Sequence, residues 1–370
     1  FSQIGSEEVT NGSFSQEGSE QVTSFINGTT YPFSTFTSLD NNITSAIINS
    51  NFAGCVSNSI NVTSSQIYKV SFNYTKNSGD DLRVVFSSVV SGAGSQTSNS
   101  ELVSASGSIT LYLTISSSVT SYLQLGTASA SASIDFSISN LSVKEVGQDW
   151  TLGTGITISE NSANFTGNPN SFLTQSGVVT LNKTYKATFT ISNYVSGAID
   201  INLGGSTRQG NVNANGTYTF YIKVPSGNIL YFQEDFTNGF IGSITNISVK
   251  EVGQNWLLDA NWSIGDDVAI SDGSVNGFIR TSTNLFENGK TYKVGLTVSN
   301  MTTGRVTYPY DGGGTNYIYT NGDFSQTYTP DDTNKCWIYG ANGFDGSITN
   351  ISIIEITDDT NLPRINYSGF

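Results

Sequence analysis

Histidine is absent from this sequence of 370 residues, cysteine occurs only twice, and charged residues make up only 12% of the chain. The absence of histidine excludes Ser-His-Asp triads, Cys-His pairs and zinc sites with histidine ligands. Cys55 and Cys336 are far apart and fall in different copies of the internal repeat described below, so a disulfide between them is not expected. The sequence therefore lacks the residues for the common forms of nucleophilic catalysis and of zinc binding.

Basic residues and long apolar runs are also scarce. The chain has 15 Lys and Arg against 29 Asp and Glu, a formal net charge of −14. Without basic patches to neutralise phosphates, nucleic acid and anionic membranes are poor partners. No apolar run is long enough for membrane insertion, and no signal peptide is recognisable. Because the sequence begins with Phe1 rather than Met, we expect a processed chain or a part of a longer one.

Catalysis by carboxylates is still compatible with the sequence, because a two-carboxylate glycosidase needs only Asp and Glu. The acidic pairs of this chain lie in polar, turn-like stretches, and we predict that they are solvated turn residues. These pairs are Asp80–Asp81, Glu234–Asp235, Asp266–Asp267 and Asp331–Asp332. We therefore predict no enzymatic activity, no catalytic residue and no cofactor. Binding of a structural calcium ion remains an open alternative, but we assign no ligands to it and predict no metal site.

The sequence does contain a long internal repeat. The phrase "SISNLSVKEVGQDW" (137–150) returns as "SITNISVKEVGQNW" (243–256) and in degraded form as "SITNISIIEITDDT" (347–360). A period near 106 residues is much longer than a solenoid repeat and matches a domain. We predict a duplicated N-terminal segment at 1–23, modules at 24–147, 148–253 and 254–357, and a C-terminal tail at 358–370.

Short alternating stretches dominate each module. In "TYKATFTIS" (184–192), apolar side chains alternate with polar ones, which is typical of a strand with one face in a core. Similar stretches recur between Gly, Asn and Ser clusters about every 8–12 residues, the spacing of a β-sandwich. The predicted fold class is all-β, with three tandem jelly-roll-like antiparallel β-sandwiches.

The repeated phrase predicts the closing strand of a module. Its apolar residues change face twice, and a side chain cannot change face without an extra residue. We therefore expect one bulge near Ser139–Asn140 and another near Lys144–Glu145.

A connector to the next module follows this strand. Gly147 and Gly253 are expected to take positive φ in a turn. Trp150 and Trp256 come three residues later and could wedge the module junctions. The alternative is that each Trp sits in the core of its own module. These four residues are the predicted junction residues.

A shorter duplication precedes the first module. "FSQIGSEEVT" (1–10) is followed by "FSQEGSEQVT" (14–23), thirteen residues later. Neither copy is long enough to build a core. The two interpretations are edge strands that pair with a neighbouring chain and a mobile linker.

Several stretches together resemble proteins of a known kind. They are "VTNGSF" (9–14), "LTQSGVVTLNKTYKATFTISNYVSG" (173–197), "NGTYTFYI" (215–222) and "FIGSITNISVKEVGQNW" (240–256). Their combination resembles the tandem carbohydrate-binding-module-like jelly-roll domains of bacteriophage virion and tail-fibre proteins of marine phage type. The resemblance implies a structural appendage on the virion surface, outside the cell. It also implies a homo-oligomer that is a trimer if it forms a fibre, contacts with other virion proteins, and host surface polysaccharide as a partner.

Sugar binding on such a fold needs exposed aromatic rings and planar polar groups. Tyr308 and Tyr310 align with Ile201 and Leu203 of the second module, so we expect these two tyrosines to face a core. The remaining carbohydrate-binding candidates are Arg208, Gln233, Arg305, Tyr317 and Tyr319. Two other functions stay open: a bacterial extracellular adhesin or filament subunit, and the ancillary binding region of a polysaccharide-degrading enzyme.

Overall fold

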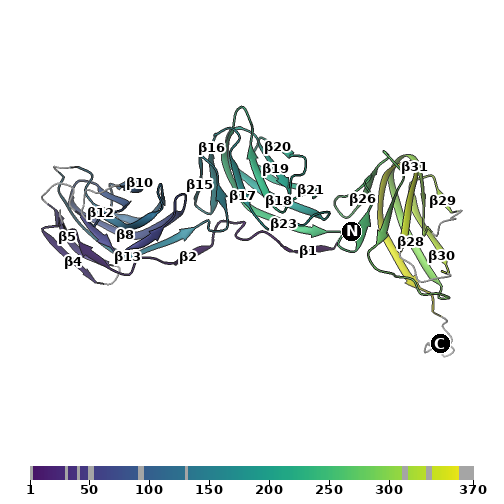
Figure 1. The fold of residues 1–370 in the computed structure, drawn as a ribbon, viewed down its shortest axis with the longest axis horizontal. Helices are drawn as coiled ribbons and strands as arrows, with labels where there is room; N and C mark the ends of the chain where they lie inside the picture. Colours follow the sequence, from purple (N-terminus) through teal and green to yellow (C-terminus); the bar gives the residue numbers. More distant parts are fainter. Residues whose placement is uncertain are drawn as a thin grey trace, which may run out of the picture.

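The computed structural model describes residues 3–29, 32–39, 42–48, 54–90, 96–129, 132–310, 316–330 and 336–357. Every regular element in these ranges is a β-strand, and the sheets are antiparallel, which confirms the all-β prediction. The strands form three lobes in a row (Figure 1). In the described ranges no helix is long and apolar enough to cross a membrane.

Lobe 1 is built from two six-stranded sheets. Its strands are β2 (Glu17–Glu20), β3 (Phe25–Asn27), β4 (Thr35–Leu39), β5 (Asn42–Ile48), β6 (Gly54–Ser57), β7 (Ile60–Val62), β8 (Ile67–Gly79), β9 (Leu82–Ser87), β10 (Gln96–Val103), β11 (Gly107–Thr114), β12 (Val119–Gly126) and β13 (Ile134–Val146). One sheet has the order β10-β9-β12-β6-β3, with β7 on β12. The other has the order β11-β8-β13-β5-β4, with β2 on β13.

Lobe 2 repeats this arrangement with a six-stranded and a five-stranded sheet. Its strands are β1 (Ile4–Glu7), β14 (Thr151–Leu152), β15 (Ile156–Ser159), β16 (Ser162–Thr166), β17 (Phe172–Gln175), β18 (Thr184–Gly197), β19 (Ile199–Leu203), β20 (Gln209–Val212), β21 (Gly216–Lys223), β22 (Leu230–Glu234) and β23 (Phe240–Val252). The first sheet has the order β15-β16-β23-β18-β21, with β1 on β23. The second has the order β14-β17-β22-β19-β20.

Lobe 3 is joined into one eight-stranded sheet. Its strands are β24 (Trp256–Leu258), β25 (Trp262–Ile264), β26 (Ala269–Asp272), β27 (Gly277–Thr281), β28 (Tyr292–Thr307), β29 (Tyr317–Ile318), β30 (Gly322–Tyr328) and β31 (Trp337–Glu355). β31 is long because the strand continues through Asn342 and Gly343, both at positive φ. In lobe 2 the corresponding stretch is two strands, β22 and β23, separated by a turn. Its first part pairs with β27, and its later part pairs with β26.

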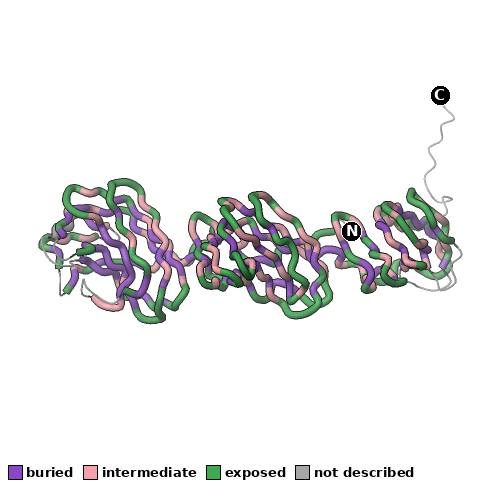
Figure 2. Tube along the Cα trace, turned by 90° about the horizontal axis from the view of Figure 1, so that it is seen from above, coloured by how far each residue is buried: buried purple, intermediate pink, exposed green. Residues whose placement is uncertain are grey.

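Each lobe has its own hydrophobic cluster. In lobe 2, Phe189 of β18 meets Phe232 of β22 edge to face, with ring centroids 4.9 Å apart, so the two sheets enclose the core between them. In lobe 1, Tyr68 of β8 and Phe86 of β9 make the matching contact at 5.1 Å. Figure 2 shows buried residues along the inside of each lobe and exposed residues around it. Burying each large ring contributes about 2–3 kcal/mol.

The first predicted bulge is confirmed. Asn140 has φ 54°, and the pairing of β13 with β8 shifts between Ser139 and Ser142. Asn246 and Asn350 have φ 52° and 51° at the same place in the other two lobes. From Ser142 to Val146 the pairing with β8 is regular. Near the second predicted position, the pairing of β13 with β2 shifts register between Lys144 and Val146, and the extra residue lies in β2.

The position of Val146 explains why β13 itself has no extra residue there. Val146 does not return to the core of lobe 1, and instead belongs to the cluster of lobe 2, together with Ile67. The outer face of the strand end is therefore buried by the next lobe. The alternation of the strand continues without an extra residue.

The two N-terminal copies are edge strands within this chain. β1, from the first copy, pairs with β23 of lobe 2, and β2, from the second copy, pairs with β13 of lobe 1. Figure 1 shows β1 beside β23 and β2 beside β13. The copies therefore follow the lobes in reverse order.

The predicted junction residues lie where neighbouring lobes meet. Gly147 and Gly253 have φ 73° and 67°, as predicted. A Cβ at Gly147 would lie 2.8 Å from Cδ1 of Ile158, and one at Gly253 would lie 2.1 Å from Cδ1 of Ile264. Glycine is therefore needed in each turn for two reasons. The backbone is left-handed, and the side chain of an isoleucine fills the space that a Cβ would take.

The two tryptophans pack with the lobe that follows each connector. Trp150 is 7% exposed, its ring lies 5.2 Å from that of Phe14, and its Nε1 donates to the carbonyl of Asn11 at 3.1 Å. Trp256 is half-buried against the cluster of lobe 3. Each indole thus belongs to the lobe that it opens, and Trp150 also holds the N-terminal segment there.

Candidate functional site

Lobe 3 carries a group of packed aromatic rings on the outer side of its sheet. The ring of Phe278 on β27 stacks on that of Tyr339 on β31, with centroids 4.5 Å apart and planes 25° apart. Trp337 lies 5.2 Å from Phe278, and Tyr310 lies 4.9 Å from Tyr339. All four rings are partly exposed. We call these four residues the aromatic face.

Strand alternation places these rings outside the core. Ile279 and Ile338, which alternate with them along β27 and β31, are fully buried in the cluster of lobe 3. Phe278 pairs with Tyr339 across the two strands, so their side chains stand together on the opposite face. The same cluster does not include any of the four rings.

Two guanidinium groups extend the aromatic face. Arg280 lies over the ring of Trp337 at 5.6 Å and forms an ion pair with Asp259 at 3.4 Å. Arg305 lies over the ring of Tyr317 at 3.9 Å and donates to the hydroxyl of Tyr319 at 3.5 Å. The hydrogen bond to Tyr319 is the main reason why the pKa of Arg305 is raised above its usual value.

Three of the five predicted carbohydrate-binding residues therefore lie together. Arg305, Tyr317 and Tyr319 form one edge of this surface, with Tyr317 and Tyr319 41% and 59% exposed. Thr307 pairs with Tyr317 on one side and with Tyr339 on the other, which makes this edge continuous with the aromatic face.

The prediction for the two neighbouring tyrosines was half right. Tyr308 is 3% exposed in the core, as predicted. Tyr310 instead joins the aromatic face, because the backbone there departs from the strict alternation of the aligned strand in lobe 2. Phe278, Trp337 and Tyr339 were missed by sequence reasoning, although their alternation with Ile279 and Ile338 was a readable signal.

In lobe 2, the corresponding face holds the other two predicted residues. Gln233 aligns with Tyr339, is only 8% exposed, and donates to Oδ1 of Asn170 at 2.7 Å. Arg208 lies 3.6 Å from Asp200 and over the ring of Phe236 at 4.1 Å. This face also carries a smaller aromatic pair, because Phe172 and Tyr231 are partly exposed with ring centroids 6.2 Å apart.

In lobe 1, the corresponding face is closed. Val56 and Val85 are fully buried on it, and Gln124 is 1% exposed. Arg83 donates to Oε1 of Gln124 at 3.4 Å. Burial lowers the pKa of Arg83. This face is therefore buried in lobe 1, carries polar groups and two rings in lobe 2, and carries four packed rings in lobe 3.

Glu234 corrects the prediction that the acidic pairs are solvated. Its side chain is fully buried at the end of β22, where Oε2 accepts the backbone N–H of Phe240 at 2.8 Å. Burial raises the pKa of Glu234 to about 7. Asp235 does lie in a turn, and its Oδ1 accepts the N–H groups of Thr237 and Asn238, which lower its pKa.

The other acidic pairs do not form a catalytic dyad with Glu234 in the described part of the chain. Asp81 forms an ion pair with Lys76 at 3.0 Å, and Asp266 accepts the hydroxyl of Tyr221 at 2.8 Å. Asp331–Asp332 lie outside the described residues. Within the described ranges, no three or more His, Cys, Asp or Glu residues are grouped so as to hold a metal ion.

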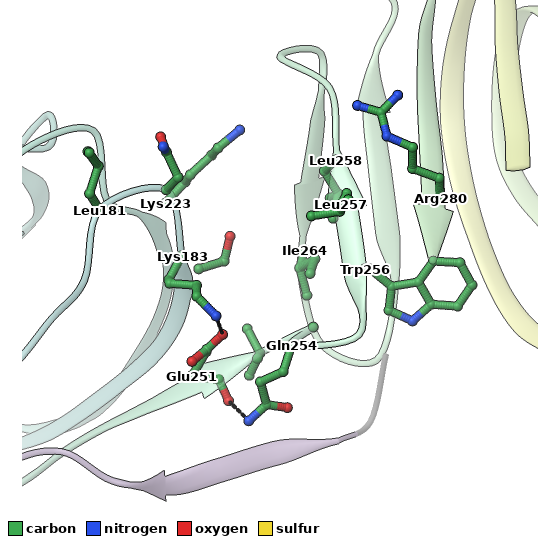
Figure 3. A pocket seen from close by; sticks show the side chains of 14 residues that line it. Leu181, Lys183, Lys223, Glu251, Gln254, Trp256, Leu257, Leu258, Ile264 and Arg280 are labelled. Carbon is green, nitrogen blue, oxygen red and sulfur yellow. Dashed lines mark hydrogen bonds and ion pairs between the residues drawn. The ribbon is translucent and has the colours of Figure 1, made fainter. Parts of the chain in front are cut away.

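A cavity of about 380 Å³ lies between lobes 2 and 3. Figure 3 shows Leu181 and Lys223 on the lobe 2 side and Leu257 and Leu258 on the lobe 3 side. An ion pair between Lys183 and Glu251, at 2.6 Å, is already formed in its wall. Trp256 is the one aromatic residue that lines it, so the aromatic face offers more to a planar or cyclic ligand.

Comparisons with known proteins add the following. No family model matches the sequence, and no curated protein matches it. Among solved structures, the chain is similar to the N-terminal CBM22-1-CBM22-2 tandem domain of Xyn10C from Paenibacillus barcinonensis, at 10% identity and a TM-score of 0.22, over 64% of this chain and 99% of that one. It is also similar to a chain of the Sulfolobus Turreted Icosahedral Virus, at 14% identity and a TM-score of 0.17, over 91% of this chain and 90% of that one. At these TM-scores neither similarity carries an argument about function.

Proposed function

We propose that the protein is a structural appendage of a virion surface and that its third lobe binds glycans through the aromatic face. The observation that carries the glycan-binding part is the set of four packed, partly exposed rings flanked by two guanidinium groups. Sugar rings present axial C–H groups that pack on aromatic faces, while their hydroxyls accept hydrogen bonds from planar donors. Both kinds of group are present on one continuous surface.

The placement on a virion rests on the sequence resemblance to phage tail-fibre proteins. Three lobes in a row suit an appendage, because a ligand-binding lobe at one end is carried away from the other end (Figure 1). The proposed partners are other copies of this chain, other virion proteins and a host surface polysaccharide. No catalytic step is proposed, since the buried Glu234 lies away from the aromatic face on another lobe.

The glycan-binding part is tested with the intact protein and soluble polysaccharides from bacterial surfaces in affinity electrophoresis. We expect retardation by at least one polysaccharide, and we expect Trp337→Ala to abolish it. Tyr231→Ala, at the aligned position in lobe 2, is the matched control and should leave the retardation unchanged. Retardation that survives Trp337→Ala, or the absence of any retardation, would overturn the proposal.

The virion part is tested separately. Electron microscopy of native material, labelled with an antibody against this chain, should place the label on phage particles. Label on cell-derived filaments would instead support an adhesin or filament subunit, whatever the result with polysaccharides.

A further inference from the structure

The two N-terminal edge strands bind their lobes through the same contacts. In β1, the carboxylate of Glu7 accepts the hydroxyl of Ser248 at 2.5 Å and the N–H of Val249 at 2.8 Å. In β2, the carboxylate of Glu20 accepts the hydroxyl of Ser142 at 2.6 Å and the N–H of Val143 at 2.7 Å. One side-chain carboxylate thus replaces a backbone acceptor in each ladder.

The residues on either side of this glutamate also make equivalent contacts in the two copies. Val9 and Val22, two positions later, are 7% and 0% exposed and complete the clusters of lobes 2 and 1. A Cβ at Gly5 would lie 2.5 Å from Nε2 of Gln254, and one at Gly18 would lie 2.7 Å from Nε2 of Gln148. The glycine, glutamate and valine of the shared sequence Gly-Ser-Glu-x-Val-Thr therefore meet the same surroundings in both lobes.

Lobe 3 has the same receiving strand. Ser352 and Ile353 of β31 align with Ser248 and Val249 of β23. Ile353 pairs with Val294 of β28, just as Val249 pairs with Ala187 of β18. In an antiparallel sheet a residue directs its N–H and C=O to the same side. The register therefore directs both groups of Ile353 to the outer edge, as it does for Val249.

In the described ranges, this edge of lobe 3 carries no added strand. β26 pairs with β31 only from Asp345 to Ile348, and no pairing is recorded on that side of Ser352–Glu355. Ile353 is only partly buried, whereas Val249 is fully buried. Ile354 and Ile356 are 61% and 48% exposed. An exposed strand edge with apolar side chains is a template for another strand.

We propose that the edge of β31 at Ser352–Glu355 binds an extended segment of a partner protein that carries the sequence Gly-Ser-Glu-x-Val-Thr. We take the occupant from a separate chain, while the two copies within residues 1–370 stay engaged on lobes 1 and 2. Its glutamate binds the hydroxyl of Ser352 and the N–H of Ile353, and its valine covers Ile351 and Ile353. The segment adds as an antiparallel strand.

The residue before the Gly-Ser-Glu sequence differs between the two copies. In lobe 1 it is Glu17, which forms ion pairs with Lys69 at 2.7 Å and Lys144 at 3.1 Å. These lysines are the reason why the pKa of Glu17 is lowered. Lobe 3 has Ile354 at the position of Lys144 and of Lys250 in lobe 2, so the ion pair of Glu17 with Lys144 has no counterpart there. A segment with Ile before Gly-Ser-Glu, as in the first copy, does not need that ion pair.

The test is hydrogen–deuterium exchange of the full chain with a synthetic peptide of residues 1–13. We expect amide exchange at 352–355 to slow by about tenfold at saturation. The same peptide with Glu7→Ala should bind about tenfold more weakly, because it leaves the Ser352 hydroxyl and the Ile353 N–H without a charged acceptor. A peptide of residues 14–26, with Glu in place of Ile, should also bind more weakly.

Two variants of the chain keep the test decisive. Ile354→Lys restores the lysine of the other lobes and should strengthen binding of the peptide of residues 14–26, because Glu17 of that peptide regains an ion-pair partner. Val9→Asp releases β1 and is the positive control, since the peptide must then protect β23 of lobe 2. Protection of β23 in that variant without protection of β31 in any variant would overturn the proposal. Protection of 352–355 that rises with protein concentration and needs no peptide would also overturn it, because a second copy of the chain would then be the occupant.

Discussion

Where lobe 3 carries Tyr339 and Trp337, lobe 2 carries Gln233 and Tyr231 at the aligned positions of the same sheet face. Gln233 turns inward to Asn170 and is almost buried, whereas Tyr339 stacks on Phe278 and stays partly exposed. At this position one fold thus uses the same face for an internal hydrogen bond in lobe 2, beside the ring pair Phe172–Tyr231, and for a stack of rings in lobe 3. The strand edges of the two lobes also differ. β1 pairs with the edge of β23 in lobe 2, whereas the matching edge of β31 in lobe 3 is unpaired within the described ranges.

The difference shows how a repeated sandwich can divide its tasks. The core residues of the two lobes keep their alternation and therefore their fold. The residues that face outward are free to change without cost to the core, so they determine what each lobe binds. The following predictions would sharpen this comparison or break it.

The largest expected effect comes from Val9→Asp. A charge in place of a side chain that is 7% exposed costs about 2–4 kcal/mol of unfolding free energy, because the carboxylate finds no partner in the core. Hydrogen exchange should speed up in β23 of lobe 2 and stay unchanged in β31 of lobe 3. Ile4→Asp, at a position that is 50% exposed, is the control with little effect. Equal loss in both lobes would show that their stabilities are not separate.

The next effect concerns the buried carboxyl of Glu234. Its pKa is raised from 4.5 to about 7, so the folded state holds a proton that the unfolded state releases. Lobe 2 therefore loses stability as the pH rises from about 4.5 to 7, and the loss is complete above pH 7. Glu234→Gln should increase the unfolding free energy by about 1–3 kcal/mol at pH 8 and change it little at pH 4.

Lobe 3 supplies the control for this effect. It has Gly340 at the aligned position, so its own transition should not depend on pH in this way. Urea unfolding at several pH values measures both lobes. A gain that is equal at pH 4 and pH 8 would contradict the role of the carboxyl proton.

A smaller effect is expected from the two stacked arginines. Arg305 lies over Tyr317 at 3.9 Å, and Arg208 lies over Phe236 at 4.1 Å. Arg305→Ala should weaken polysaccharide binding about fivefold, because it removes a donor and releases Tyr317, a contact worth about 1 kcal/mol. Arg208→Ala is the matched control in lobe 2. If Arg208→Ala weakened binding equally, the ligand would not be confined to lobe 3.

The smallest effect concerns the contact between the two lobes. The hydroxyl of Tyr221 in lobe 2 donates to Asp266 in lobe 3 at 2.8 Å. Tyr221→Phe should cost about 0.5–1 kcal/mol of interlobe coupling, because the contact is exposed. Small-angle scattering should show a broader distribution of lengths for the variant. Tyr112→Phe provides the comparison at the other junction, where the Tyr112 hydroxyl accepts the N–H of Glu160 at 3.0 Å.

Local patterns were enough to predict much of the fold. The alternation in 184–192 gives a strand with one buried face, and the structure shows β18 there with Tyr185, Ala187 and Phe189 buried. The change of face at Ser139–Asn140 gives the bulge, because an extra residue is the only way to turn a side chain to the other face. Arg305, Tyr317 and Tyr319 were predicted as sugar-binding candidates because such a site needs exposed rings and planar polar groups, and the structure places the three together.

Contacts between distant segments decided the rest. β13 has no extra residue before Val146 because lobe 2 buries Val146 from outside. Tyr310 leaves the core because Phe278 and Tyr339, from two other strands, offer it a stack of rings. No local pattern could show which lobe each N-terminal copy would bind.

The sequence by itself determined the repeat, the strands and the positions that need positive φ, since these follow from side-chain alternation and from backbone sterics along a few residues. The tertiary structure decided which outward faces are buried, bonded or left open, and which strand edges are filled. Those outcomes depend on residues that meet across a hundred positions or more, as Glu7 meets Ser248. The same phrase of sequence is therefore a covered edge in lobes 1 and 2 and, within the described residues, an open one in lobe 3.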